Sequence, residues 1–223
     1  MSRAILIVGT DTEIGKTFVT GRLCRAWRQA GIDCGVYKPV QSGSPAIDHP
    51  DSDASRLQAV SGVPELPTQL CAYSFPEPLA PPVAARRTGV ELSLNDLVTA
   101  CREPLGRHEL TLIETAGGFL SPTAVDGTVA DFAVALGCPI LLVARAGLGT
   151  VNHTLLTLEA MRRRDLNCLG VMLNGATGTL AELDNPTLIE TFGNVGILGV
   201  VPHGPGADAA LDRIAQCAIQ TVQ

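Results

Sequence analysis

The sequence has 223 residues, a formal net charge of −6 and a pI near 5.2. A chain of this length is expected to fold as a single domain over residues 1–223 and to bury about 70% of the surface that its unfolded form exposes. Its acidic balance argues against nucleic acid as a partner, because neutralising a phosphate backbone requires a basic face. We therefore expect its partners to be small molecules.

The cysteines and the hydropathy pattern indicate the compartment. The cysteines are widely separated, without a C-x-x-C pair or a nearby histidine at metal-binding spacing, and are expected to be reduced packing residues. The apolar run after Arg3 ends at Gly9, which is too short for a signal peptide, and no stretch is long enough to span a bilayer. We expect a cytoplasmic protein without a membrane partner. The cysteines are Cys24, Cys34, Cys71, Cys101, Cys138, Cys168 and Cys217.

The stretch from Ile5 to Thr17 predicts a phosphate-binding loop between a strand and a helix. The unbroken apolar run Ile5–Val8 is typical of a strand buried on both faces. A helix with an apolar face follows directly, and the free N–H groups and dipole of its first turn form an anion site. Lys16 is expected to reach the outer phosphates of a nucleotide, and the Thr17 hydroxyl to coordinate Mg2+.

The match of this loop to the usual pattern G-x-x-x-x-G-K-[ST] is incomplete. Gly9 lies one position early, and Thr10 stands where the first glycine is expected. The competing interpretation is a chance Gly-Lys-Thr that begins an ordinary helix. The strand before the loop, the helix after it and the second glycine at Gly15 favour nucleotide binding.

A second strand is predicted from Cys34 to Lys38, and Pro39 is expected to end it. Lys38 and Ser42 would then lie at the carboxyl edge of the sheet, where α/β proteins bind ligands. Asp48, Asp51 and Asp53 follow, and one of them is a candidate metal ligand because carboxylates near a polyphosphate need a cation between them. The alternative for Asp53 is that it only caps the next helix.

Residues 63–82 hold six prolines and predict a long extended connection on the surface. Ser93, with Asp96 three residues later, predicts the start of a helix that ends before Pro104. The apolar run 110–113 predicts the next buried strand. Glu114 follows it, and this carboxylate is expected to complete a Mg2+ shell or, alternatively, to cap a turn.

Strands alternate with helices through the rest of the chain. This order predicts an α/β fold with a doubly wound, mainly parallel sheet, helices on both faces and a P-loop nucleotide site at the carboxyl edge. The triplet 162–164 is interpreted as a solvated helix end without a ligand role. The further predicted elements are strands 139–144, 168–174 and 197–201, and helices 150–164 and 207–222.

Five segments give the chain a resemblance to the dethiobiotin synthetases. The first, with its run Thr-Asp-Thr-Glu, is the most specific, and the set covers nearly the whole chain. One departure is Thr115, which stands where that family usually has glycine and would add a side chain beside the phosphates. The segments are Gly9–Thr17, Tyr37–Gly43, Glu114–Gly118, Gly147–His153 and Asn174.

The resemblance implies ATP-dependent closure of a ureido ring. 7,8-Diaminopelargonic acid and CO2, supplied as bicarbonate, form a carbamate; ATP phosphorylates it; and the neighbouring amine displaces phosphate. The implied cofactor is Mg2+, held by Thr17, Asp53 and Glu114. Lys16 and Lys38 are implied to stabilise charge on the transferring phosphoryl group and the carbamate.

The resemblance also implies binding residues and a homodimer. Thr12 is implied both in catalysis and in holding substrate or phosphate oxygens, and the loose match at His203–Ala207 limits the adenine contacts. The implied substrate-binding residues are Thr12, Ser42, Gly118 and, across a twofold dimer interface, Leu148 and Asn152. The implied ATP-binding residues are Glu13, Ile14, Gly15, Lys16, Thr17, Phe18, Asp53, Glu114, Gly117, Asn174 (to adenine), Pro202, His203 and Gly204.

Two other protein classes share the predicted sheet. A nucleotide-driven switch or partitioning ATPase would carry a signature lysine early in the phosphate loop, where this chain has Asp11. It would also need a basic or amphipathic partner-binding segment, which the sequence lacks. The amide-forming ligase domain of cobalamin synthesis normally comes with a glutaminase, for which this chain has no room. The sequence therefore favours the synthetase.

Overall fold

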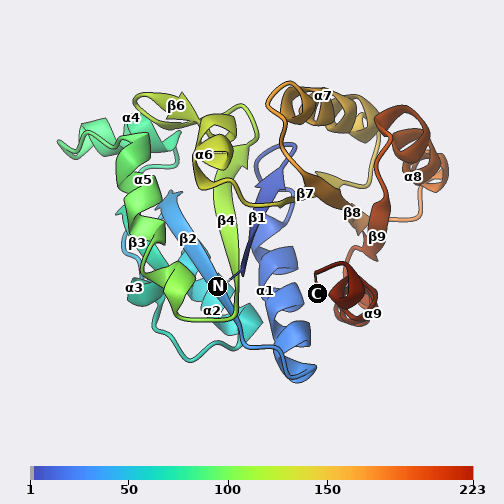
Figure 1. Ribbon diagram of the computed structural model, residues 1–223, viewed down its shortest axis with the longest axis horizontal. Helices are drawn as coiled ribbons and strands as arrows, with labels where there is room; N and C mark the ends of the chain where they lie inside the picture. The colour runs from blue at the N-terminus through green and yellow to red at the C-terminus, as the bar shows by residue number, and fades with distance from the viewer. Residues whose placement is uncertain (1–2, 223) are drawn as a thin grey trace.

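The computed structural model describes residues 3–222, with side chains for residues 3–216 (Figure 1). A sheet of seven parallel strands runs through its middle in the order β3-β2-β4-β1-β7-β8-β9. This arrangement confirms the predicted α/β fold with a parallel sheet. The strands are β1 (Arg3–Gly9), β2 (Cys34–Ser42), β3 (Cys71–Phe75), β4 (Leu110–Gly118), β7 (Ile140–Arg145), β8 (Cys168–Ala176) and β9 (Ile197–Pro202).

Helices cover both faces of this sheet, as predicted for a doubly wound fold (Figure 1). One face carries α1 (Lys16–Gln29), α2 (Asp53–Ser61), the short α3 (Pro67–Leu70) and α9 (Ala207–Val222). The opposite face carries α4 (Pro81–Arg87), α5 (Leu94–Cys101), α6 (Val129–Leu136), α7 (Thr150–Arg162) and α8 (Leu180–Gly193). A 3-10 turn, η1 (Pro104–Gly106), and an antiparallel hairpin of β5 (Pro122–Ala124) and β6 (Gly127–Thr128) complete the described elements.

The central strand β1 shows why its apolar run has no polar alternation. Ile5 and Ile7 pack on the face of α1, α2 and α9, whereas Leu6 and Val8 pack on the opposite face. Each of these side chains is at most 2% exposed. Because successive side chains of a strand point to opposite faces, a sheet covered on both sides needs apolar residues at every position. Full burial of each stabilises the fold by about 1.5–3 kcal/mol.

Strand β2 is longer than predicted, because Pro39 does not end it. The strand changes neighbours there: it pairs with β4 as far as Tyr37 and with the edge strand β3 from Lys38 onward. The register with β3 passes from Lys38 to Val40, so the strand accommodates a residue that has no N–H. The extension carries Ser42 to the carboxyl edge inside the strand rather than in a loop.

The prediction of one extended surface connection over residues 63–82 is wrong. This stretch contains α3 and the edge strand β3, whose Cys71 and Phe75 side chains are buried. Pro67 begins α3 and Pro76 directly follows β3, and no proline lies within β3, so that strand can complete its hydrogen-bond ladder with β2.

Three helices and one strand show which sequence signals succeed and which fail. Ser93 and Asp96 form the predicted capping box at the start of α5, with Ser93 N–H donating to Asp96 Oδ2 at 2.9 Å. Sequence analysis did not predict α6, which is almost entirely apolar and lacks helical periodicity, or α8, which contains Pro186. Strand β4 continues past Ile113 to Gly118, so Glu114 lies within the strand.

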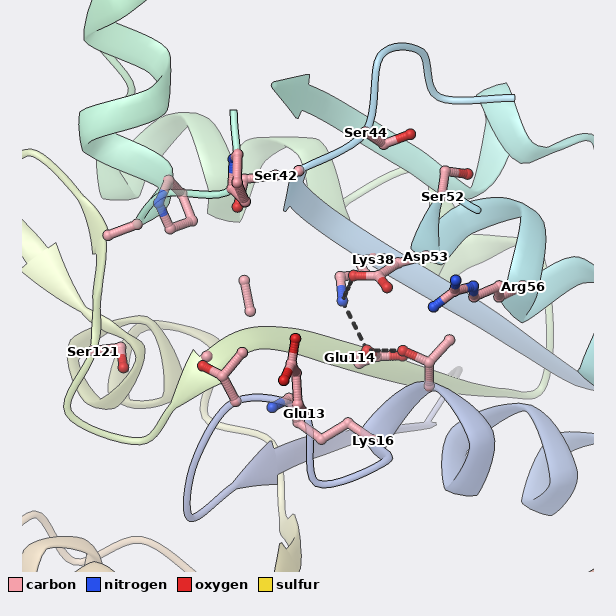
Figure 2. A pocket seen from close by; sticks show the side chains of 18 of the residues that line it. Glu13, Lys16, Lys38, Ser42, Ser44, Ser52, Asp53, Arg56, Glu114 and Ser121 are labelled. Carbon is pink, nitrogen blue, oxygen red and sulfur yellow. Dashed lines mark hydrogen bonds and ion pairs between the residues drawn. The ribbon is translucent and has the colours of Figure 1, made fainter. Parts of the chain in front are cut away.

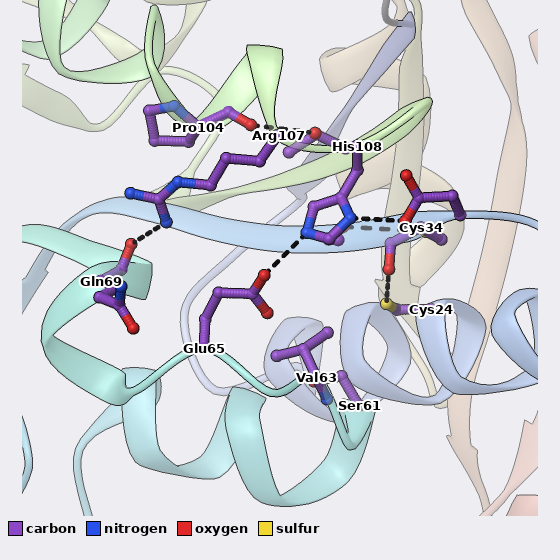
Figure 3. A network of polar contacts seen from close by, with 12 residues as sticks. Cys24, Cys34, Ser61, Val63, Glu65, Gln69, Pro104, Arg107 and His108 are labelled. Carbon is purple, nitrogen blue, oxygen red and sulfur yellow. Dashed lines mark hydrogen bonds and ion pairs between the residues drawn. The ribbon is translucent and has the colours of Figure 1, made fainter.

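A polar cluster closes the amino edge of the sheet (Figure 3). His108, just before β4, places Nδ1 2.7 Å from Asp33 Oδ1, just before β2, and Nε2 3.0 Å from Glu65 Oε1 in the α2–α3 connection. A Cβ on Gly35 would lie 2.1 Å from the His108 ring, so the imidazole packs directly against β2 at this glycine. We refer to Asp33, Glu65 and His108 as the amino-edge cluster.

The described cysteines agree with the expectation of reduced packing residues. Cys24, Cys34, Cys71 and Cys101 are buried free thiols, while Cys138 and Cys168 are half-buried free thiols. The side chain of Cys217 lies outside the described residues. Within the described part of the chain, every helix is too short or too polar to span a bilayer.

Candidate active site

The phosphate loop joins β1 to α1 and has the strained backbone that such loops need. Gly15 stands directly before α1 with φ 86°, and Glu13 has φ 56°, both in the left-handed region. A Cβ at Gly15 would lie 2.2 Å from Asn174 Nδ2, and that amide donates to the Ile14 carbonyl at 2.8 Å. The loop is therefore held from β8 as well as by its own residues.

Gly9 explains why the loop departs from the usual phosphate-loop pattern. A Cβ at this position would lie 2.9 Å from both the Asp11 carbonyl oxygen and Lys16 Nζ. Lys16 Nζ donates to that same carbonyl at 2.8 Å, folding back over the loop. Glycine at position 9 thus leaves the room that the Lys16 side chain occupies. The early glycine has a steric reason, and Thr10 does not need to be glycine.

Four side chains predicted from distant segments meet beside this loop (Figure 2). Lys38 Nζ lies 2.8 Å from Glu114 Oε1 and also forms an ion pair with Asp53. Thr17 donates its hydroxyl hydrogen to the same Glu114 oxygen at 2.7 Å. We refer to Thr17, Lys38, Asp53 and Glu114 as the site cluster. It contains all three residues implied as metal ligands.

The charges of the site cluster shift the pKa values of its members and of the adjacent Lys16. Burial and, next, the nearby charge of Lys38 lower the pKa of Lys16 to about 8. Burial alone would lower the pKa of Lys38, but Glu114 and Asp53 outweigh it and hold that pKa above its ordinary value. Burial opposes ionisation of Asp53 too, yet Lys38 keeps the pKa of this carboxyl below its usual range. Lys38 and Asp53 are therefore both charged at neutral pH.

Glu114 has one oxygen in use and one spare. Its side chain is 1% exposed, and Oε1 accepts both hydrogen bonds of the cluster. Oε2 is buried and has no hydrogen-bond partner among the described residues. A buried carboxylate oxygen without a partner is costly, so this atom marks a place where a donor or a cation would be stabilising.

A large cavity of about 1010 Å3 opens over the cluster and the phosphate loop. Its walls include many of the predicted site residues. They also include side chains that sequence analysis missed. Ser44, Ser52, Arg56 and Ser121 are among the latter; no local motif singles them out (Figure 2). The predicted residues on its walls are Thr12, Glu13, Gly15, Lys16, Thr17, Phe18, Lys38, Ser42, Asp53, Glu114 and Gly117.

A second cavity of about 440 Å3 shares Phe18 with the first as a lining residue. Its walls gather the four residues that were implied as adenine contacts together with the turn before α9. One N–H of the Asn174 amide donates to the Ile14 carbonyl, which leaves the other N–H and the amide oxygen for a ligand. The predicted residues here are Asn174, Pro202, His203 and Gly204.

The remaining predicted residues lie elsewhere. Leu148 is 86% exposed and Asn152 is exposed, and both lie near the start of α7, outside the walls of these two cavities. Gly118 is buried in β4 as the register partner of Gly9, and Ile14 is a buried side chain whose carbonyl holds Asn174.

Thr115 does not crowd the phosphates as expected. Its buried hydroxyl donates to the Ile7 carbonyl at 3.1 Å, which turns the side chain into the sheet. The reason is strand alternation: Glu114 faces the cavity, so the next residue of β4 points to the opposite face. The threonine that replaces the usual glycine therefore packs in the interior of the protein.

Asp11 has a role that the sequence analysis did not assign. Its carboxylate accepts from its neighbour Thr12 N–H at 2.8 Å and pairs with Arg145 Nη2 at 2.6 Å. Arg145 ends β7, the strand next to β1 in the sheet. This pair ties the start of the phosphate loop to the neighbouring strand.

A family model and curated relatives match most of this chain. A family model described as an AAA domain matches residues 3–210. An ATP-dependent dethiobiotin synthetase of Bacillus thuringiensis (strain Al Hakam) is 42% identical over 202 residues, covering 90% of this chain and 83% of the relative. Another, of Anaeromyxobacter dehalogenans, is 50% identical over 172 residues, covering 77% of this chain and 76% of the relative.

Solved structures with the same fold are more distant in sequence. The septum site-determining protein MinD of Pyrococcus horikoshii, complexed with Mg-ADP, superposes with a TM-score of 0.62 at 17% identity, covering 100% of this chain and 98% of that one. The MinC:MinD complex of Aquifex aeolicus gives 0.65 at 12% identity, covering 98% and 96%. These likenesses support the fold alone. The much higher identity to the synthetases, sustained over most of both chains, shows that this chain belongs to the ATP-dependent dethiobiotin synthetase family.

Proposed function

We propose that this chain closes the ureido ring of dethiobiotin from 7,8-diaminopelargonic acid, CO2 and ATP, acting on a Mg2+-bound nucleotide in the large cavity. The observation that carries the proposal is the site cluster, in which Lys38 is buried between Glu114 and Asp53 beside the phosphate loop. A buried, charged lysine at the mouth of a phosphate loop serves phosphoryl transfer, which relies on positioning and on cations near the developing charge.

Thr17, Asp53 and Glu114 would hold the Mg2+. They offer hard oxygen donors, and the spare Oε2 of Glu114 fits the need for a cation. Among residues 3–216, no group of three or more His, Cys, Asp or Glu side chains is arranged to hold a metal ion. A small number of protein ligands is sufficient for Mg2+, because this ion usually keeps several waters and also binds substrate phosphates. When bound, it supplies positive charge to the triphosphate oxygens.

Different residues of the chain would assist the successive steps of the reaction. A carbamate formed from one amine of the substrate and CO2 attacks the γ-phosphorus of ATP, and the bond to ADP breaks. Lys16 and Lys38 offset the negative charge that spreads over the transferring group. The second amine attacks the carbamoyl carbon, loses a proton and expels phosphate, which closes the ring. Thr12 and Ser42, which both line the cavity, would hold substrate or phosphate oxygens.

The second cavity is assigned to adenine, with Asn174, Pro202, His203 and Gly204 as its contacts. Phe18 lines both cavities and would separate the base from the phosphates. The exposed Leu148 and Asn152 would contact the substrate chain across a homodimer interface, for which their exposure at the start of α7 is the support. Free thiols at all the described cysteines support a reducing compartment, and we infer the cytoplasm.

The test is phosphate release from ATP in the purified chain, with product mass measured in parallel. We expect release to require both 7,8-diaminopelargonic acid and bicarbonate, with dethiobiotin as the product. Omission of Mg2+ should abolish release. Steady ATP hydrolysis that is indifferent to the diamine would instead place the chain with the nucleotide-driven switch ATPases that share its fold.

A further inference from the structure

The buried guanidinium of Arg22 joins the phosphate-loop helix to the last helix. Arg22 lies on α1 and is 9% exposed. Its Nη2 donates to both carboxylate oxygens of Asp212, at 2.8 and 3.0 Å, and its Nε lies 3.4 Å from Asp208 Oδ1. Both aspartates belong to the first turns of α9, which lies beside α1 (Figure 1). A buried arginine is stable only when paired in this way.

One of these two aspartates also lines the smaller cavity. The wall from Pro202 to Asp208 connects β9 to α9 and forms most of that cavity. Its first part is held to β8, because His203 N–H donates to the Ala176 carbonyl at 2.7 Å. Its far end is held to α1 through Arg22. Between these two anchors, Gly204 and Gly206 have φ of 78° and 94°, so the turn depends on its ends for its position.

The same helix therefore reaches both parts of a bound nucleotide. The first turn of α1 carries Lys16 and Thr17 at the phosphate end, and Arg22 lies further along it. Because a helix is rigid over this length, fixing Asp208 and Asp212 to Arg22 fixes the separation between the phosphate site and the wall of the smaller cavity. The Nε of Arg22 is buried and has no hydrogen-bond partner among the described residues, so a small movement of Asp208 would complete one.

We propose that Arg22 is a positioning residue for the nucleobase: it holds the 202–208 wall at the distance from the phosphate loop that a nucleotide requires. This inference rests on the proposed function, since it takes the smaller cavity as the base site. Arg22 does not line either cavity described above and acts only through Asp208 and Asp212.

The test compares two ligands that differ in the base. ADP occupies both the phosphate site and the base site, whereas inorganic tripolyphosphate occupies only the former. Calorimetric titration of the Arg22→Met chain should show the Kd of ADP raised about tenfold, a coupling of ordinary size for residues in one network. The Kd of tripolyphosphate should stay within about twofold of the unmodified chain.

Trp27→Phe is the matched control. The Trp27 indole donates to the Ala215 carbonyl at 2.9 Å and also joins α1 to α9, but away from the cavity wall. It should lower the melting temperature without changing the ratio of the two affinities. Asp212→Asn removes the charge at similar volume and should change the ratio of the two affinities as Arg22→Met does. It replaces Arg22→Met in the test if the Arg22→Met chain folds poorly. An unchanged ratio in the Arg22 and Asp212 variants, or an equal change in Trp27→Phe, would overturn the inference. An unmodified chain that binds ADP no better than tripolyphosphate would instead count against the base site itself.

Discussion

Strands β2 and β4 carry a charged cluster at each end, and the two clusters differ in what surrounds them. At the amino edge, Asp33 and Glu65 occupy both ring nitrogens of His108 (Figure 3). At the carboxyl edge, Lys38 joins Asp53 and Glu114 on the wall of a cavity of about 1010 Å3. The first cluster fastens two strands to a connection, whereas the second keeps charges ready for a ligand.

The comparison shows that ion pairing alone does not identify a functional site. Both clusters are formed by side chains that are far apart in the sequence, and each contains one basic residue between two carboxylates. What separates them is access: only the carboxyl-edge cluster is joined to a phosphate loop and a cavity. Perturbed charges become candidates for chemistry when a substrate can reach them.

The largest difference between the clusters should appear in turnover. Lys38→Ala is expected to lower kcat by about 10^2 to 10^3-fold, because it removes a preorganised cation from the transferring phosphoryl group. The Kd of ATP should change far less, since Lys16 and the loop amides remain. Rapid-quench or steady-state phosphate release together with ATP titration measures both. Equal losses in kcat and ATP affinity would mean that Lys38 is only a nucleotide ligand.

A smaller effect is expected on the metal requirement. Glu114→Gln keeps the shape of the side chain but removes its charge, and we expect the Mg2+ concentration for half-maximal rate to rise about 10 to 100-fold. Asp51→Asn is the control, because Asp51 lines the same cavity but its side chain is 76% exposed and, among the described residues, forms an ion pair only with Arg56. A similar shift in both variants would show a general loss of negative charge rather than a specific metal ligand.

The pH dependence of ATP binding should reveal the lowered pKa of Lys16. Its pKa of about 8 means that the free chain loses this charge as the pH rises through 8. A triphosphate favours the charged amine, so binding should take up protons near pH 8 and weaken by up to about tenfold per pH unit above it. Calorimetry in buffers of different ionisation enthalpy measures the uptake. In Lys16→Arg, which stays charged, the proton uptake should disappear.

The stability effect of Lys16 has the opposite sign to its binding effect. Between pH 8 and its ordinary pKa of 10.5, the unfolded chain binds more protons at Lys16 than the folded chain does. This group therefore makes the folded chain more stable as the pH rises through that window.

The smallest effect on activity belongs to the amino edge. His108→Gln should lower the free energy of unfolding by about 0.5–1.5 kcal/mol, because the partly exposed carboxylates of Asp33 and Glu65 lose hydrogen bonds, and should leave kcat and the KM for ATP unchanged. Chemical denaturation and steady-state kinetics together check this. The hydrogen bond from His108 also holds the pKa of Asp33 below its usual range, so this contribution is present at neutral pH and is lost as the pH falls through the lowered value. A large loss of kcat would show that the two ends of the strands are coupled.

Local sequence signals correctly predicted the features that depend only on residues close together in the sequence. The phosphate loop, the capping box at Ser93 and the buried strand Ile5–Val8 all lie within a few residues of their signals. The predicted end of β2 at Pro39 was wrong because its pairing partner changes there, and that depends on β3. Thr115 was expected beside the phosphates, but its direction follows from the register of β4 with β1.

By itself, the sequence determined the alternation of strands and helices, the phosphate loop and, through its resemblance to known synthetases, the membership of Lys38, Asp53 and Glu114 in one site. Only the tertiary structure decided that Lys38 lies buried between those two carboxylates, that Glu114 keeps one oxygen spare, and that Arg22 links the phosphate helix to the wall of the smaller cavity. The physical reason is distance along the chain. A loop or a cap is stabilised by its immediate neighbours, whereas the charge and direction of a buried side chain depend on partners that only the packed sheet and helices bring together.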